Sequence, residues 1–238
     1  MKARPPQRTG KIIFITGTDT GVGKTVFTAL LLHHLRTSGV HALAMKPFCS
    51  GGRADVHLLR AMQDSELSED EINPFYFSEP VAPLVAARRH NKSISLAEVL
   101  RQIKRISQRC ECLLIEGSGG LSVPLGENFL VSDLIQRLES EVIIVARNRL
   151  GTINHTLLTL NGLLLKRTKS RGIKKIRIAL IDSEKTDSSC SSNQQILSEL
   201  CAPIPVWAVD FLGKNASKYG VLKKKYEKVK KTLARFSG

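Results

Sequence analysis

The chain has 238 residues, of which 42% are hydrophobic, and this length and composition suit one α/β domain with a sizeable buried core. Its formal net charge is +15, but aromatic residues make up only 5% of the chain and hardly interleave with the basic ones, so we do not expect nucleic acid as a partner. No apolar run approaches the roughly 18 residues of a membrane span, and the apolar segment after residues 1–11 is too short for a signal-peptide core, so we expect a cytoplasmic protein without a membrane partner.

Short β-type runs alternate with longer helical segments along the chain, which favours βαβ units and a mainly parallel sheet. We expect strands at residues 12–16, 42–47, 112–115, 142–146, 176–181 and 206–209. We expect helices at about residues 24–37, 55–63, 95–109, 152–165 and 193–200. Residues 73–87 contain three prolines and predict a loop.

Neither an internal repeat nor a low-complexity linker divides the chain. The sequence therefore predicts a single doubly wound α/β domain over residues 1–238, with helices on both faces of the sheet and a core at about residues 11–210. A basic amphipathic helix is expected at about residues 220–236.

The positive charge gathers in two segments. Residues 166–177 hold seven Lys or Arg and no acid, and residues 214–235 hold nine against Glu227 alone. We interpret both as solvated basic faces, although the same field would also attract an anionic substrate.

The segment GTDTGVGKT, residues 17–25, lies between the first expected strand and the first expected helix. It ends as phosphate-binding loops do, in Gly23-Lys24-Thr25, but Thr18 stands where the usual spacing places the first glycine. Backbone N–H groups of such a loop face a phosphate chain, and the helix that follows offers its positive end to the same anion. We expect Lys24 to reach the β- and γ-phosphates and the Thr25 hydroxyl to hold Mg²⁺, which indicates a P-loop NTPase fold.

Ligands of doubly wound sheets bind beyond the carboxyl ends of the strands. Glu116 ends one apolar strand and Asp55 begins the helix after another, so both are candidate Mg²⁺ ligands. Lys46 ends the strand next to the phosphate loop and can stabilise charge on a transferring phosphoryl group. Ser50 follows on the same loop and can hydrogen-bond a small substrate.

Six blocks of the sequence resemble the dethiobiotin synthetase family in order and spacing. They are GTDTGVGKT, KPFCSG from residue 46, Asp55, INPFYFSEPVAP from residue 72, LLIEGSGG from residue 113 and LGTINHTLLT from residue 150. The likeness extends from about residue 11 to residue 210, and the shifted phosphate loop is itself the family form.

This resemblance implies an enzyme that uses Mg²⁺ and ATP to close a cyclic urea on 7,8-diaminononanoate with CO₂, the penultimate step of biotin synthesis. It implies that a substrate carbamate attacks the γ-phosphate and that the second amine captures the resulting anhydride. It also implies a homodimer with shared active sites, in which a helix start receives the substrate carboxylate from the partner subunit.

Residue roles follow from the resemblance position by position. The implied catalytic residues are Lys46, Lys24 and Thr20. The implied substrate contacts are Ser50, Gly151, Thr152 and Asn154. The implied nucleotide contacts are Gly21, Val22, Gly23, Lys24, Thr25, Val26, Asp55, Glu116, Gly117, Ser118, Gly119, Asp182, Ser183, Pro205, Val206 and Trp207. The implied Mg²⁺ ligands are Thr25, Asp55 and Glu116.

The chain departs from the family pattern in three places. Asp182 stands where the family usually has an asparagine that reads adenine, and a carboxylate accepts hydrogen bonds but cannot donate one, so it could accept from guanine as readily. Residues 183–193 have no clear counterpart, and the basic C-terminal segment lies outside the family pattern.

A second function class is a P-loop ATPase of the chromosome-partitioning type that binds nucleic acid through a basic surface. Those proteins usually carry an extra lysine early in the phosphate loop, where this chain has Thr18, Asp19 and Thr20. Cobyrinate-amidating synthases share a similar loop but add a glutamine-hydrolysing domain, for which residues 1–238 offer no counterpart. A paralogue that binds nucleotide without turnover is disfavoured by the intact Lys24, Lys46 and Glu116.

Overall fold

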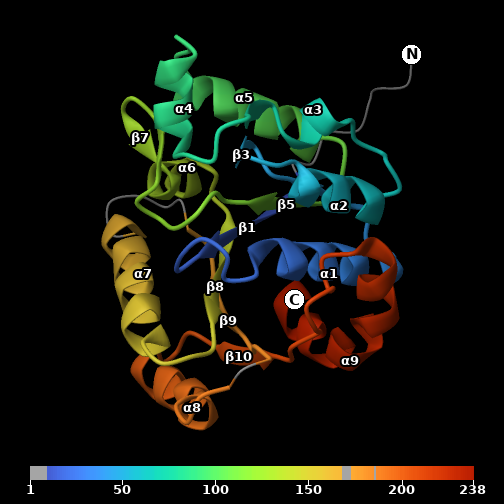
Figure 1. Ribbon diagram of the computed structural model, residues 1–238, viewed down its shortest axis with the longest axis vertical. Helices are drawn as coiled ribbons and strands as arrows, with labels where there is room; N and C mark the ends of the chain where they lie inside the picture. Colours follow the sequence, from blue (N-terminus) through green and yellow to red (C-terminus); the bar gives the residue numbers. More distant parts are fainter. Residues whose placement is uncertain (1–9, 168–172, 185) are drawn as a thin grey trace, which may run out of the picture.

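A computed structural model of the chain describes residues 10–167, 173–184 and 186–238 (Figure 1). Residues 168–172 of the basic run expected at residues 166–177 lie outside the described residues, and so does Lys185 within the segment 183–193. In the described parts of the chain, no helix is both long and apolar enough to cross a membrane.

The described residues form a six-stranded sheet in which every neighbouring pair is parallel, in the order β10-β9-β8-β1-β5-β2. Its strands are β1 (Lys11–Gly17), β2 (Ala42–Met45), β5 (Cys112–Glu116), β8 (Glu141–Arg147), β9 (Ile176–Ile181) and β10 (Val206–Val209). All six predicted strands are present. Their near-continuous apolar sequences are those of strands buried on both faces, as a parallel sheet covered by helices requires.

Helices cover both faces of this sheet, as predicted (Figure 1). The helices are α1 (Lys24–Thr37), α2 (Ala54–Met62), α3 (Glu69–Ile72), α4 (Pro83–Arg89), α5 (Leu96–Ser107), α6 (Val131–Arg137), α7 (Thr152–Arg167), α8 (Cys190–Leu200) and α9 (Tyr219–Ser237). Figure 1 shows α1 and α9 on one side of the sheet and α6 and α7 on the other.

Strand β1 lies near the middle of the sheet, at the point where the winding changes direction. The chain leaves β1 for the edge strand β2, returns to β5, and then crosses β1 to reach β8, β9 and β10 in turn. In doubly wound sheets such a switch point opens a crevice at the carboxyl ends of the strands. The loop after β1, which carries the phosphate-binding motif, lies at that crevice.

The prediction that residues 73–87 form a loop is wrong in part. The short strand β4 (Phe75–Phe77) pairs with β3 (Phe48–Ser50), and the rings of Phe48 and Phe75 stack with centroids 4.9 Å apart. Pro83 is the first residue of α4, where the missing N–H removes no intrahelical hydrogen bond. One of the three prolines, Pro83, therefore begins a helix rather than preventing regular structure. A further hairpin joins β6 (Pro124–Gly126) to β7 (Phe129–Leu130).

The basic helix α9 packs its apolar side on α1. Its Phe236 meets Phe27 edge to face with centroids 5.1 Å apart, and its Tyr226 hydroxyl lies 2.8 Å from Nδ1 of the buried His34. The helix that follows the phosphate loop is thus held by the last helix of the fold.

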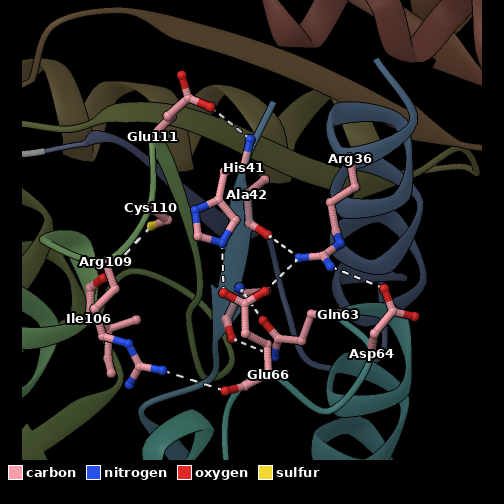
Figure 2. Close-up of polar contacts among 11 residues, drawn as sticks. Arg36, His41, Ala42, Gln63, Asp64, Glu66, Ile106, Arg109, Cys110 and Glu111 are labelled. Carbon is pink, nitrogen blue, oxygen red and sulfur yellow. Dashed lines mark hydrogen bonds and ion pairs between the residues drawn. The ribbon is translucent and has the colours of Figure 1, made fainter. Parts of the chain in front are cut away.

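A polar cluster ties the elements together at the amino ends of β2 and β5, opposite the crevice (Figure 2). Glu66 accepts hydrogen bonds from Arg36 of α1 at 3.2 Å and pairs with the His41 ring at 2.6 Å. Arg36 also donates to the Ala42 carbonyl and to Asp64, both at 3.0 Å. This cluster fixes α1 against the edge strand β2.

Candidate active site

The phosphate loop closes tightly because two of its glycines admit no side chain. A Cβ on Gly17 would lie 2.9 Å from the Asp19 carbonyl oxygen and 2.9 Å from the Lys24 ammonium nitrogen. Gly23 has φ 105°, a left-handed conformation that only glycine adopts readily. The early glycine of the shifted motif is therefore a steric requirement of this loop.

Lys24 begins α1 and bends back over the loop. Its side chain is 7% exposed, and its ammonium donates a hydrogen bond of 2.8 Å to the Asp19 carbonyl. Burial lowers the pKa of Lys24, and the Glu116 carboxylate opposes this effect. Lys24 also lines the cavity beside the loop, where a phosphate group would give its ammonium a further partner.

The predicted metal ligands and Lys46 form one polar cluster at the strand ends. Glu116, at the end of β5, is 1% exposed and accepts hydrogen bonds from the Thr25 hydroxyl at 2.7 Å and from the Lys46 ammonium at 2.9 Å. Lys46 follows β2 and also forms a very short ion pair with Asp55 in the first turn of α2. Three segments that are far apart in the sequence thus place a hydroxyl, an ammonium and two carboxylates together.

Opposing forces act on the protonation of Lys46. Burial alone would lower the pKa of its ammonium, but the carboxylates of Glu116 and Asp55 raise it above the usual lysine range. Lys46 therefore carries a positive charge at neutral pH. Oε2 of Glu116 is buried and has no hydrogen-bond partner among the described residues, so it is available to a cation.

A cavity of about 680 Å³ opens above this cluster. The predicted residues that line it are Thr20, Gly21, Gly23, Lys24, Thr25, Val26, Lys46, Ser50, Asp55, Glu116, Gly117, Ser118 and Gly119. The hydroxyl of Ser50 is buried without a hydrogen-bond partner in the described part of the chain. A polar group of a bound molecule would satisfy it.

A second cavity, of about 190 Å³, adjoins the first. The two share the lining residues Gly23, Val26 and Ser217. The second is lined mainly by apolar side chains such as Phe27 and Leu30, together with the predicted Val22, Asp182 and Ser183. Its charged lining residues are Arg147, Asp182, Asp210 and Lys214. An elongated ligand with a charged end over the phosphate loop would therefore place its other end among apolar walls and these charged groups.

The structure does not bring Pro205, Val206 and Trp207 to either cavity. They lie at the amino end of β10, whereas the crevice lies at the carboxyl ends of the strands. Trp207 instead meets Phe236 edge to face at 4.9 Å. The loop after Val209 lines the second cavity instead, through Asp210, Phe211, Leu212 and Gly213, and the nucleotide contact at residues 205–207 stays a prediction.

The predicted substrate contacts Gly151, Thr152 and Asn154 lie apart from the large cavity. Gly151 and Asn154 are exposed and Thr152 is buried at the start of α7. The same helix exposes two leucines seven residues apart, Leu158 at 63% and Leu165 at 70%, which lie on one face because seven residues make about two turns.

Several residues of the cavity walls escaped the sequence analysis. The large cavity is also lined by Phe48, Cys49, Gly52, Pro80, Val81, Ala82, Pro83, Val123 and Ser217. Residues 80–83 belong to the family motif INPFYFSEPVAP. The sequence therefore contains the motif, but it does not indicate that these residues lie beside the phosphate loop. Residues 210–213 could have been found from the end of the sixth predicted strand alone.

Comparison with known proteins places these features in a family. A family model described as an AAA domain matches residues 11–206. The ATP-dependent dethiobiotin synthetase of Bacillus subtilis (strain 168) is 40% identical over 215 residues, which cover 88% of this chain and 90% of the relative. The enzyme of the same name from Akkermansia muciniphila is 37% identical over 192 residues, covering 80% and 88%.

Solved structures share the fold at much lower sequence identity. The MinC:MinD cell division protein complex of Aquifex aeolicus matches with a TM-score of 0.60 at 13% identity, over 96% of each chain. A pNOB8 ParA structure matches with a TM-score of 0.58 at 15% identity, over 95% of this chain and 98% of the other. These likenesses concern the P-loop fold alone. The sequence relatives show that this chain belongs to the ATP-dependent dethiobiotin synthetase family.

Proposed function

We propose that the chain carboxylates 7,8-diaminononanoate with CO₂ and closes the product to dethiobiotin, using ATP and releasing ADP and phosphate. This makes it a ligase that forms carbon–nitrogen bonds in biotin biosynthesis. The observation that carries the proposal is the charged Lys46 beside Glu116 in a cavity that the phosphate loop also lines. The sequence relatives of the same name support it.

The residues have separate tasks in this reaction. The loop N–H groups and Lys24 hold the triphosphate, while Lys46 faces the region where carbamate and γ-phosphate meet and stabilises the negative charge of both. Thr20 and Ser50 lie on the cavity wall and hydrogen-bond the substrate side. No covalent enzyme intermediate is needed, because positioning and charge neutralisation suffice for this displacement.

Thr25, Asp55 and Glu116 would hold Mg²⁺. Their hydroxyl and carboxylate oxygens are the ligands that this ion prefers, and the unpartnered Oε2 of Glu116 fits such a role. When bound, Mg²⁺ neutralises charge on the phosphate chain. Among the remaining predicted contacts, Gly117 to Gly119 line the large cavity, and Asp182 with Ser183 line the second cavity, where the base would bind.

We also infer a homodimer in which Gly151, Thr152 and Asn154 receive the substrate carboxylate from the partner's cavity. Support comes from their position outside the cavity of their own chain and from the leucines that α7 exposes beside them. The start of a long helix favours an anion through its free N–H groups and its dipole.

The test is nucleotide hydrolysis by the purified chain with Mg²⁺, bicarbonate and the diamine, with dethiobiotin followed by mass spectrometry. Hydrolysis should depend on the diamine, and product should form in proportion to the phosphate released. Hydrolysis that ignores the diamine and rises with DNA would instead support an ATPase of the partitioning type.

A further inference from the structure

The chain leaves the six-stranded sheet directly at Lys46. Strand β2 ends at Met45 on the edge of that sheet, and β3 begins at Phe48 in the small sheet with β4. Pro47, which lies between them, has no N–H to donate. Lys46 therefore belongs to neither sheet, and the direction of its side chain depends on partners from elsewhere in the fold.

The segment that follows α3 supplies these partners. The Lys46 N–H donates a 2.9 Å hydrogen bond to the carbonyl of Ile72. Nδ2 of Asn73 donates to the Lys46 carbonyl at 2.9 Å and to the Pro47 carbonyl at 3.2 Å. The backbone of Lys46 is thus held on its N–H side by a carbonyl and on its carbonyl side by a side-chain amide.

The Asn73 amide has one usable orientation. Asn73 is 1% exposed, and its own N–H donates to the Glu69 carbonyl at 2.8 Å, so its backbone is fixed. Both groups that its Nδ2 contacts are carbonyl oxygens, which only accept hydrogen bonds. Turning the amide over would set Oδ1 against two acceptors in the protein interior, where such a contact is costly. Nδ2 is therefore a fixed donor to both carbonyls.

We propose that Asn73 is a positioning residue for the reaction, because its amide fixes the backbone from which the Lys46 ammonium extends to Glu116. This inference rests on the proposed function, in which Lys46 stabilises the charge of the reacting groups, and it adds the residue that orients Lys46. Asn73 does not line the large cavity, so it acts through Lys46. A shift of about 1 Å in a catalytic group can lower a rate by about 100-fold.

A second buried amide binds the same stretch of backbone and provides a matched control. Gln63, labelled in Figure 2, is fully buried. Its side chain accepts from the Ala44 N–H at 2.9 Å and donates to the Ala44 carbonyl at 3.2 Å. Ala44 precedes Lys46 by two residues and does not line the large cavity. Gln63 and Asn73 thus each make two hydrogen bonds to this backbone, but only Asn73 holds the residue that carries the ammonium.

The experiment compares Asn73→Ala and Gln63→Ala with the unmodified chain. Both variants should melt at a lower temperature, because each loses two buried hydrogen bonds. Only Asn73→Ala should lower kcat for diamine-dependent dethiobiotin formation, by about tenfold to 100-fold. Its calorimetric affinity for the Mg²⁺ salt of ATP should stay within about threefold, because the phosphate loop and Lys24 are untouched.

Equal losses of kcat in the two variants, or an unchanged kcat in Asn73→Ala, would overturn the inference. Asn73→Ser keeps a hydroxyl donor and leaves a smaller cavity, so the same comparison is made with it if Asn73→Ala does not fold. An unmodified chain without diamine-dependent turnover would overturn the proposed function itself, and with it this inference, so the two failures are distinguishable.

The Lys46→Gln background gives a readout that a merely structural residue would not change. Because Asn73 acts through the Lys46 ammonium, adding Asn73→Ala to Lys46→Gln should lower kcat by less than about threefold further. A further loss as large as that of the single Asn73→Ala variant would show that Asn73 acts independently of Lys46, contrary to the inference.

Discussion

Lys46 is the side chain whose surroundings differ most from those of an ordinary surface lysine. It is 9% exposed and lies between Glu116 and Asp55, whose carboxylates keep it charged against the effect of burial. A buried cation with a fixed direction stabilises developing negative charge more strongly than a solvated one, because no water has to reorganise.

Replacing Lys46 by glutamine should therefore lower turnover by about 100-fold or more, the effect of removing one preorganised donor to a reacting anion. Nucleotide affinity should stay within about tenfold, roughly 1.4 kcal/mol, because the phosphate loop and Lys24 are untouched. Steady-state kinetics and calorimetry on the same preparation measure both. The comparison variant is Lys24→Ala, which should lose nucleotide binding; an equal loss in Lys46→Gln would refute the role given to Lys46.

Glu66, in the cluster of Figure 2, makes the stability of the fold depend on pH. Burial opposes its ionisation, but its hydrogen bonds with His41 and Arg36 lower its pKa below the ordinary 4.5. A carboxyl whose pKa is lowered on folding contributes stability above its unfolded pKa and loses that contribution as pH falls through the folded value. The window affected therefore lies below about pH 4.5.

Glu66→Gln should lower the unfolding free energy at pH 7 by less than about 1 kcal/mol, because the pairs are partly exposed. Below pH 4.5 the variant should lose stability less steeply than the unmodified protein. Urea unfolding between pH 3 and pH 7 tests this. Glu98→Gln serves as the control, since Glu98 makes no ion pair with the described residues; parallel curves for Glu66→Gln and the unmodified protein would count against the argument.

At the scale of elements, α9 supports α1 and hence the loop that α1 follows. Two of its side chains, Tyr226 and Phe236, reach His34 and Phe27 on α1, while its lysines other than the half-buried Lys225 are exposed. The basic charge of this helix is therefore carried on the side away from the packing contact, as an amphipathic pattern requires.

Tyr226→Phe removes the hydroxyl that partners the buried His34 ring, so a buried polar nitrogen is left without its hydrogen bond. We expect a loss of about 1–3 kcal/mol in unfolding free energy. Tyr219→Phe on the same helix should cost less than about 0.5 kcal/mol, because Tyr219 is 37% exposed. Urea unfolding of both variants decides; equal losses would show that the Tyr226 hydroxyl contributes no special stability.

Elements built on local patterns could be predicted from the sequence, and those that depend on neighbours could not. The apolar runs of the six strands and the cap at Ser95, which accepts from the Glu98 N–H, are local features. Strand β4 has only three residues and exists because Phe75 stacks on Phe48, and α4 uses a proline as its first residue. In the sequence alone, neither a three-residue strand nor a proline at a helix start outweighs three prolines in fifteen residues, which indicate a loop.

The candidate site divides in the same way. Lys24, Lys46, Asp55 and Glu116 stand at strand ends or helix starts, so a rule about parallel sheets was enough to bring them together. The nucleotide contact predicted at residues 205–207 falls at the amino end of β10, outside both cavities, because likeness in a divergent segment does not define which end of a strand faces the crevice.

At the scale of the whole molecule, the apolar face of α7 bears on assembly. Apolar residues fall on most sides of the helix expected at residues 152–165, so the sequence alone does not indicate which of them are buried. In the structure Leu160 and Leu163 are buried and Leu158 is exposed. The start of α7, which we propose as the carboxylate contact, lies outside the large cavity of its own chain. The exposed Leu158 on the same helix therefore suits an interface between two copies.

Leu158→Asp should convert a dimer into a monomer and abolish diamine-dependent turnover while nucleotide binding persists, because the nucleotide lies within one chain. Size-exclusion chromatography with light scattering reports the assembly state. Leu200→Asp on α8 is the matched control, as Leu200 is similarly exposed at 58%, and it should stay dimeric. A monomeric unmodified protein with full turnover would rule out the shared site.

The packing of α9 on α1 has a consequence for synthesis on the ribosome. His34 and its partner Tyr226 are 192 residues apart, so the helix that carries Lys24 emerges long before the helix that covers it. During that interval Phe27 lacks its aromatic neighbour, and the apolar flank of α1 is open to chaperones. We therefore expect nucleotide to bind well only once α9 covers α1.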